Sequence, residues 1–164
     1  RLSHHQRGRS VAPHAIGVLH LVQPPATARA RQHPVNVAGV PSAIAHADPA
    51  ALEQLLHHLV QNAIEASPPD APVTLAVGAD GSHVTIDVID RGCGMSAAFV
   101  RDKLFKPFVS SKPGGFGIGA FEARQLAGAM DGRIEVISRE GEGTRFRVIL
   151  KAAHAADLRE DQAA

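Results

Sequence analysis

The feature that most constrains the fold is one long amphipathic run, "HADPAALEQLLHHLVQNAIEAS", at residues 46–67. Asp48 is a suitable N-cap with Pro49 at the first helical position, and "SPPDAP" ends the run. The apolar residues recur at alternating steps of three and one, as on one face of an α-helix; they are Leu52, Leu55, Leu56, Leu59, Val60, Ala63 and Ile64. Such a helix needs an apolar surface to cover this face.

That surface is predicted to be a sheet. Residues 83–90, "HVTIDVID", alternate apolar and polar side chains, and Asp80-Gly81 marks a hairpin turn after "VTLAVG". Further strands are predicted at residues 33–39, 132–140 and 143–151, and further helices at residues 96–105 (capped by Ser96) and about 117–130, with a loop over residues 105–115. We therefore predict an α/β (α+β) two-layer sandwich, with a mixed, mostly antiparallel sheet and helices on one face.

The composition is that of an ordinary globular protein and excludes several classes. The 164 residues carry a net charge of +1, so bulk nucleic-acid binding is not expected. One cysteine rules out an internal disulfide, and no apolar run approaches the roughly 20 residues of a membrane span. Prolines interrupt residues 1–32, where at most short helices are expected. We predict an N-terminal extension at residues 1–32, a main domain at 33–151 and an exposed tail at 152–164.

A glycine-rich stretch, "GFGIGAFEARQLAG" at residues 115–128, leads into a predicted helix. Bare backbone N–H groups at a helix start suit a phosphate. The chain has no G-x-x-x-x-G-K-[ST] motif, which excludes a Walker A loop. Residues 115–120 satisfy G-x-G-x-x-A, but a polar loop rather than a buried strand precedes them, which argues against a dinucleotide site.

A second glycine cluster, "DRGCGM" at residues 90–95, follows a predicted strand. The carboxylate of Asp90 can accept a hydrogen bond from an exocyclic amine such as that of adenine. Gly92 and Gly94 would let a flat base approach the backbone closely. Taken alone, this pattern favours an Asx turn that leaves the strand.

A polar stripe lies beside the apolar face of the long predicted helix. His58, Asn62 and Glu65 are spaced at i, i+4 and i+7. The amide oxygen of Asn62 is a suitable ligand for Mg²⁺, which prefers oxygen. The alternative is a solvated helix face, since polar side chains are mostly exposed.

These groups occur in the order "HHLVQNAIEAS", "DRGCGM", "LFKPFVSSK", "GGFGIGAFEA" and "GEGTRFRV". This order resembles the ATP-binding domain of sensor histidine kinases, in the superfamily of DNA gyrase, MutL and the heat-shock chaperone ATPases. The resemblance covers about residues 33–150. The amino-acid sequence of the motifs is most similar to that of the membrane histidine kinase of PEP-CTERM/exosortase systems. It implies a Bergerat-type fold that holds ATP and Mg²⁺ between the long helix, the strand end and a lid.

The resemblance also implies roles for single residues. Asn62 would coordinate Mg²⁺, and Asp90 would read adenine together with Thr144. Lys112 could add a positive charge to the terminal phosphate or be a solvated loop lysine. His58 stands where ATPases of the superfamily carry a water-activating Glu; it could assist phosphate transfer or be a half-buried helix histidine. The other implied nucleotide contacts are Glu65, Gly92, Gly94, Met95, Phe105, Phe108, Gly115, Gly117, Ile118 and Gly119.

The implied reaction moves the γ-phosphoryl group of ATP to a histidine on a separate dimerisation domain. None of the 10 histidines is followed by Asp or Glu, and the chain begins at Arg1, so we expect a fragment without that domain. The expected partners are this phosphoacceptor domain and a response regulator. The fragment is expected to be a cytoplasmic monomer without direct membrane contact, from a parent that could be anchored in the inner membrane. Two alternatives share the pocket: an anti-sigma-type protein serine kinase, and a module that binds ATP but transfers nothing.

Overall fold

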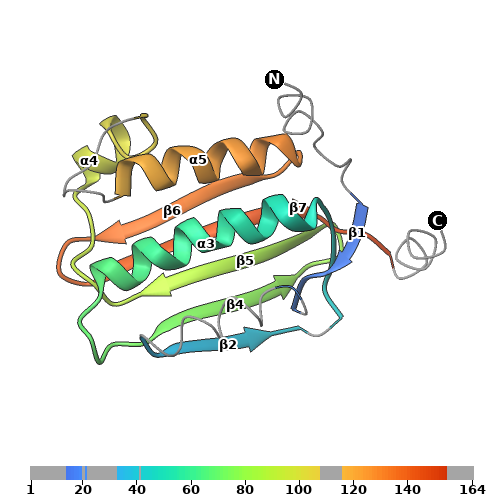
Figure 1. Ribbon diagram of the computed structural model, residues 1–164, viewed down its shortest axis with the longest axis horizontal. Helices are drawn as coiled ribbons and strands as arrows, with labels where there is room; N and C mark the ends of the chain where they lie inside the picture. Colours follow the sequence, from blue (N-terminus) through green and yellow to red (C-terminus); the bar gives the residue numbers. More distant parts are fainter. Residues whose placement is uncertain (1–13, 20, 22–32, 41, 108–115, 155–164) are drawn as a thin grey trace, which may run out of the picture.

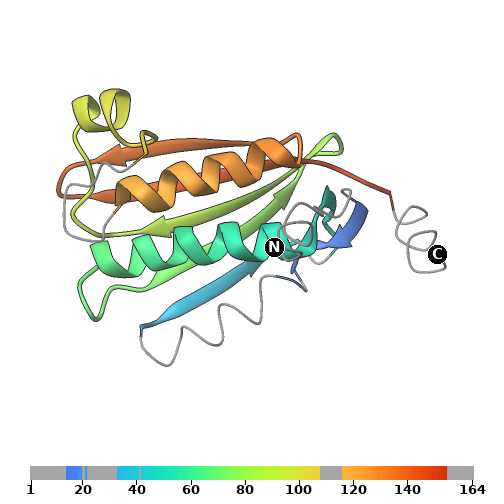
Figure 2. The ribbon, with the colours of Figure 1, turned by 45° about the horizontal axis from the view of Figure 1, so that its top comes forward.

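The computed structural model describes residues 14–19, 21, 33–40, 42–107 and 116–154. A five-stranded sheet of order β2-β4-β5-β7-β6 carries two long helices, α3 and α5, on one face (Figures 1 and 2). The elements are β2 (Val35–Gly39), α3 (Pro49–Ala66), β4 (Val73–Ala79), β5 (His83–Asp90), α4 (Ala97–Asp102), α5 (Phe116–Ala129), β6 (Arg133–Arg139) and β7 (Gly143–Lys151). β2 pairs with β4 in parallel, and the other neighbouring strands pair antiparallel. The predicted fold class is therefore confirmed.

α3 forms because its cap and its apolar stripe agree. The carboxylate of Asp48 accepts hydrogen bonds from the N–H groups of Ala50 and Ala51 at 3.1 and 3.5 Å. At the other end, the hydroxyl of Ser67 donates to the carbonyl of Ala63 at 2.6 Å. The predicted apolar stripe is buried against β4, β5 and α5, except Ile64, which is half-buried. None of the helices within the described ranges is long and apolar enough to cross a membrane.

The sheet is amphipathic as the alternation in β5 predicts. Val84, Ile86 and Val88 are buried beneath the helices. On the opposite face, Asp87 is buried as well, but Arg147 donates two hydrogen bonds to its carboxylate at 2.7 and 2.8 Å. This bidentate pair raises the pKa of Arg147 further above its usual value. The Asp87–Arg147 ion pair thus links β5 to β7.

Two short strands were not predicted. β1 (His14–Gly17) pairs antiparallel with β3 (Ile44–Ala47), and Ala15 and Val18 are buried against the main domain. Residues 14–17 were expected to contain at most short helices, and that expectation was wrong. Four-residue strands of small and mixed side chains have too little periodicity to be recognised, and their pairing depends on tertiary contact.

Candidate nucleotide site

Several elements start or finish at one end of the sandwich, on the left in Figure 1. β5 ends there at Asp90, and the strand register places Asp90 opposite Thr144 of β7 and Thr144 opposite Ser138 of β6. α3 ends at Ala66 and α5 begins at Phe116 at the same end of the sheet. Residues predicted from separate parts of the sequence therefore meet in one region.

Asp90 is a buried carboxylate with only 5% of its surface exposed. Its Oδ1 accepts a hydrogen bond from the N–H of Gly92 at 2.8 Å, which is the Asx turn considered from the sequence. Burial raises the pKa of Asp90 above its usual value, while hydrogen bonds from the backbone of Gly92 and Thr144 act in the opposite direction. The turn and a base-reading role are thus compatible, because the turn fixes the carboxylate in a buried position.

Thr144 is buried next to Asp90 and is tied to β6. Its Oγ1 lies 2.7 Å from the hydroxyl of Ser138. The same Ser138 hydroxyl accepts a hydrogen bond from the backbone N–H of Met95 at 2.8 Å. Asp90, Thr144 and Met95, all predicted site residues, are therefore joined into one region by backbone and hydroxyl hydrogen bonds.

Gly92 and Gly94 allow the loop after β5 to lie directly on two other backbone segments. A Cβ on Gly92 would overlap the carbonyl oxygen of Ala66, where α3 ends. A Cβ on Gly94, whose φ is +69°, would overlap the carbonyl oxygen of Arg139. The N–H of the intervening Cys93 donates to the carbonyl of Ala66 at 3.1 Å. The close packing of this loop against the end of α3 and against Arg139 therefore requires both glycines. Contact of these glycines with a base stays a prediction.

Asn62 is 5% exposed and faces the start of α5. A Cβ on Gly119, in the first turn of α5, would lie 2.9 Å from Nδ2 and 3.3 Å from Oδ1 of Asn62. Nδ2 is buried and has no hydrogen-bond partner among the described residues. The solvated-face alternative is thus excluded for Asn62. An unpaired buried amide group costs free energy, which makes Asn62 a candidate ligand-binding group.

His58 lies one helical turn before Asn62 and is half-buried, with 23% of its side chain exposed. Its Nε2 is buried, and within the described part of the chain it too has no hydrogen-bond partner. Oε2 of Glu122, on α5, is 3.4 Å away, within ion-pair range if His58 is protonated but not aligned as a hydrogen bond. Both interpretations of His58, a transfer-assisting group and a half-buried helix histidine, fit this position.

Two other predicted residues lie near the site without a visible role in it. Glu65 is exposed and accepts a hydrogen bond from Gln61 at 3.0 Å, on the solvent side of α3. Phe105 is half-buried, and the guanidinium of Arg124 on α5 lies 5.1 Å from its ring centroid. Nucleotide contact by either residue stays a prediction.

Part of the predicted site falls outside the described residues. Phe108, Lys112 and Gly115 belong to this part. Gly117 and Ile118 are placed in α5 by their backbone only. The roles predicted for these five positions are therefore not tested.

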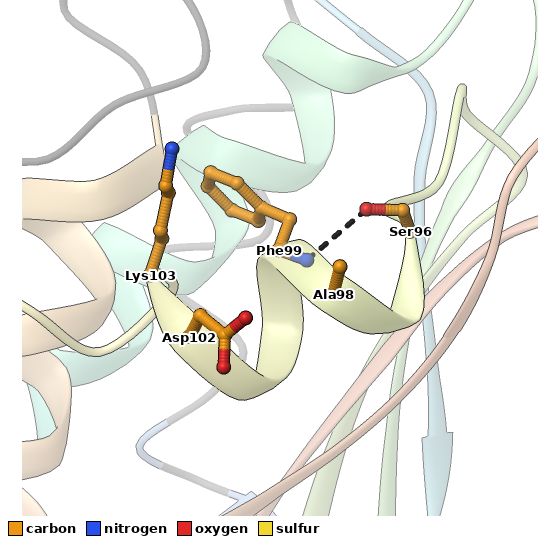
Figure 3. Close-up of a pocket in the computed structure, with 5 residues that line it drawn as sticks. All are labelled: Ser96, Ala98, Phe99, Asp102 and Lys103. Carbon is orange, nitrogen blue, oxygen red and sulfur yellow. Dashed lines mark hydrogen bonds between the residues drawn. The ribbon is translucent and has the colours of Figure 1, made fainter.

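A separate pocket of about 290 Å³ lies on α4. It is lined by Ser96, Ala98, Phe99, Asp102 and Lys103, as Figure 3 shows. The hydroxyl of Ser96 caps α4 by accepting a hydrogen bond from the N–H of Phe99 at 3.1 Å. None of these residues is among the predicted site residues.

The sequence of this region matches a known family. Residues 47–154, which include the whole of α3 and β4 to β7, match the family described as "Histidine kinase-, DNA gyrase B-, and HSP90-like ATPase". The chain belongs to this ATPase family. Membership supports the use of ATP by the site.

Members named as sensor kinases are similar to this chain. The C4-dicarboxylate transport sensor protein DctS of Rhodobacter capsulatus is 36% identical over 131 residues, 74% of this chain and 19% of DctS. Sporulation kinase C of Bacillus subtilis is 33% identical over 99 residues, 60% of this chain and 23% of that kinase. The chain thus spans about a fifth of the length of these curated relatives. Within the ATPase family, these two relatives of the chain are named as a sensor protein and a sporulation kinase.

Solved structures confirm the fold. The catalytic domain of the histidine kinase ThkA superimposes with a TM-score of 0.75 at 21% identity, covering 86% of this chain and 96% of that domain. Full-length ShkA, crystallised in complex with AMPPNP, has the same TM-score at 26% identity and covers 91% of this chain and 33% of ShkA. The fold of this ATPase-family chain is therefore that of histidine kinase catalytic domains.

Sequence reasoning missed two residues of the site, Ser138 and Glu122. Ser138 occupies a core-facing position of β6, in the alternation Ile134, Val136, Ser138. A polar residue at such a position, opposite Thr144 in the second hairpin, was a readable signal once the register was known. No sequence pattern indicated Glu122, because its proximity to His58 depends on how α5 packs on α3.

Proposed function

We propose that this chain is the ATP-binding catalytic domain of a sensor histidine kinase. It transfers the γ-phosphoryl group of ATP to a histidine on a separate dimerisation domain. The observation that carries the proposal is that Asp90 pairs with Thr144 at the end of the sheet where α5 begins, and that the buried amide of Asn62 lies against Gly119 in the first turn of α5. The names of the relatives support it, and so does the capture of AMPPNP, an analogue of ATP, by ShkA.

The strand ends fit an adenine base. Asp90 offers a buried acceptor to the exocyclic amine, held in place by the hydrogen bond from the backbone N–H of Gly92. Thr144 adds a hydroxyl in the same row of the sheet. Guanine presents a carbonyl where adenine has an amine, so the carboxylate of Asp90 disfavours it. Adenine selectivity follows from this single acceptor.

The seam between α3 and α5 fits magnesium-bound phosphates. Nδ2 of Asn62 has no hydrogen-bond partner among the described residues and could donate to a phosphate oxygen. Oδ1 of the same amide is the atom that would hold Mg²⁺, which is commonly bound by one or two side-chain oxygens together with substrate phosphates. The described part of the chain holds no cluster of three or more His, Cys, Asp or Glu that could bind a metal without a nucleotide. Mg²⁺, when bound through Asn62, would offset phosphate charge, and this chain's own contribution is to position the nucleotide.

The finer assignments are part of the same proposal. The acceptor histidine lies on a dimerisation domain of the parent protein, and a response regulator takes the phosphoryl group next. The chain acts in the cytoplasm, and the parent belongs to the PEP-CTERM/exosortase type that the sequence resembles. We assign Asn62 as the magnesium ligand, with His58 and Lys112 as candidates for assisting transfer.

The test is phosphotransfer in trans. The chain is mixed with a separately made acceptor domain of a related sensor kinase, magnesium and ATP labelled on the γ-phosphate. Label that is lost in acid but survives base is expected on the acceptor, as for phosphohistidine. Acid-stable label would identify a serine kinase instead. ATP binding without any label on several acceptor domains would contradict the kinase assignment.

A further inference from the structure

We propose that Ser138 is a positioning residue that sets the purine selectivity of the site by fixing the direction in which the Thr144 hydroxyl donates. The inference rests on the proposed function, because it concerns the base of the bound nucleotide. It starts from three short contacts of one hydroxyl group. Ser138 Oγ lies 2.8 Å from the N–H of Met95, 2.7 Å from Thr144 Oγ1 and 3.2 Å from the carbonyl oxygen of Gly143.

Two of the three contacts compete for the single proton of the Ser138 hydroxyl. The N–H of Met95 can only donate, so it occupies a lone pair of Ser138. The carbonyl of Gly143 can only accept, so both it and Thr144 are candidates for the one proton of Ser138. The contact with Gly143 is long for an O–H···O hydrogen bond, whereas the contact with Thr144 has the usual length and allows either hydroxyl to donate. The inference is that Ser138 donates to Thr144 when a nucleotide base is bound.

This direction decides what Thr144 can do. If Ser138 donates to Thr144, the proton of the Thr144 hydroxyl is free to point elsewhere, and Thr144 acts as a donor beside Asp90. If Ser138 donates to Gly143, Thr144 must donate to Ser138 and is left as an acceptor. Adenine presents a donor amine next to an acceptor ring nitrogen, whereas guanine presents the reverse. An acceptor at Asp90 with a donor at Thr144 matches adenine.

The position of Ser138 is itself well fixed. Ser138, Thr144 and Asp90 form one row across β6, β7 and β5. The loop that carries Met95 is held against β6, since Gly94 leaves no room for a side chain beside the carbonyl of Arg139. Ser138 therefore joins the glycine loop to the sheet and orients Thr144 at the same time.

The test measures dissociation constants of the whole chain for ATP, GTP and purine riboside triphosphate, with magnesium. Purine riboside triphosphate lacks the amine of adenine but keeps its ring nitrogen. In Ser138→Ala, affinity for ATP and for purine riboside triphosphate should fall about three- to tenfold, the scale of one hydrogen bond. Affinity for GTP should not fall, so the ATP-to-GTP ratio narrows. A purely structural serine would weaken all three nucleotides together.

Matched variants separate the explanations. Ser138→Thr keeps a hydroxyl and should restore the ratio, and Ser82→Ala, in the exposed turn at the far end of β5, should leave it unchanged. In a Thr144→Val background, Ser138→Ala should have little further effect, because Ser138 acts through Thr144. Ser138→Cys keeps a side chain of similar volume but replaces the hydroxyl by a thiol, which is a weak donor. This variant is used for the same measurement if Ser138→Ala does not fold.

An unchanged ATP-to-GTP ratio in the folded variant would overturn the inference, as would a full effect of Ser138→Ala in the Thr144→Val background. Either result leaves the proposed function intact, since the unaltered chain would still bind ATP. Failure of the unaltered chain to bind ATP would overturn the proposed function, and this inference with it.

Discussion

The two halves of the site differ in how far the protein itself satisfies their polar groups. At the strand ends, the carboxylate of Asp90 accepts a hydrogen bond from the backbone N–H of Gly92, and Thr144 is paired with Ser138. In the seam between α3 and α5, Nδ2 of Asn62 and Nε2 of His58 are buried without a hydrogen bond to any described residue. We call the first half the base end and the second the phosphate end.

The difference indicates which half of the site is already formed before a nucleotide binds. A buried polar group that is hydrogen-bonded stabilises the fold and fixes its own position. One that is unpaired costs free energy until a ligand pairs it, so that ligand binding recovers what folding lost. Changes to the packing and the hydrogen bonds of the base end, the charge of Asp90 excepted, should therefore reduce stability and nucleotide binding together. Changes at the phosphate end should reduce function while leaving stability nearly unchanged.

The largest effect is expected from Asn62→Ala, at the phosphate end. Loss of the amide removes the proposed magnesium ligand, so phosphotransfer to a separate acceptor domain should fall by at least about 100-fold. Because Nδ2 has no partner among the described residues, the free energy of unfolding should change by less than about 1 kcal/mol. Transfer is measured with labelled ATP and stability by urea unfolding.

Gln54→Ala is the control for this prediction, since Gln54 is an exposed residue of the same helix. It should leave both quantities unchanged. Asn62→Asp, which keeps the size of the side chain, should also abolish transfer. Near-normal transfer in either Asn62 variant would count against the metal role, and a large loss of stability would remove the contrast between the two ends.

Gly94→Ala tests the base end. The residue has φ of +69°, and a Cβ would overlap the carbonyl oxygen of Arg139. An L-residue in this left-handed conformation costs about 1–2 kcal/mol before any displacement, so the total loss of stability should be about 2 kcal/mol or more. ATP affinity should fall with it, because the displaced loop carries the N–H that bonds Asp90.

Gly128→Ala is the matched glycine, within α5 and with open space around its position. It should stabilise the protein by about 0.5–1 kcal/mol through helix propensity alone. If Gly94→Ala were as well tolerated as Gly128→Ala, the close contact between the loop after β5 and the carbonyl of Arg139 would not be needed for stability.

The same contrast shows how much of the structure could be predicted from the sequence. The long helix, both hairpins and the capping residues Asp48 and Ser96 could be predicted, because each depends on local periodicity or on one cap. The small sheet of β1 and β3 could not, because its pairing is made only in three dimensions. The same limit applies in the site. Asp90 and Asn62 stand in recognisable motifs, whereas Ser138 and Glu122 acquire their neighbours only through strand register and helix packing.

Gly119→Ala should have a smaller effect than Asn62→Ala, in the same half of the site. The new Cβ would lie 2.9 Å from Nδ2 of Asn62, so the amide must move. With no described hydrogen bond holding Nδ2, the movement costs little stability, and the helix propensity of alanine offsets part of it. Magnesium-dependent ATP affinity should fall about tenfold, because a displaced ligand loses its geometry. Titration with ATP in magnesium and in EDTA would show this, and equal magnesium dependence in the variant and the parent would contradict it.

The smallest expected effect is the pH dependence that Asp90 gives to the free protein. Burial raises the pKa of Asp90 above 3.8, so the folded state binds this proton more tightly than the unfolded state does. The contribution of Asp90 to stability is therefore full below its unfolded pKa and is lost as the pH rises through the higher folded pKa. Asp90→Asn removes this titration. The difference in free energy of unfolding, variant minus parent, should increase as the pH rises from about 3 to about 7.

Asp70→Asn, in the exposed loop after α3, is the control for loss of one carboxylate and should show no such trend. Urea unfolding at several pH values without nucleotide measures the difference. ATP selectivity over GTP should fall in Asp90→Asn at the same time, because the amide offers guanine's carbonyl a donor. A difference that instead decreased with rising pH would mean that the backbone hydrogen bonds from Gly92 and Thr144 outweigh burial, and that the base end is stabilised by its charge.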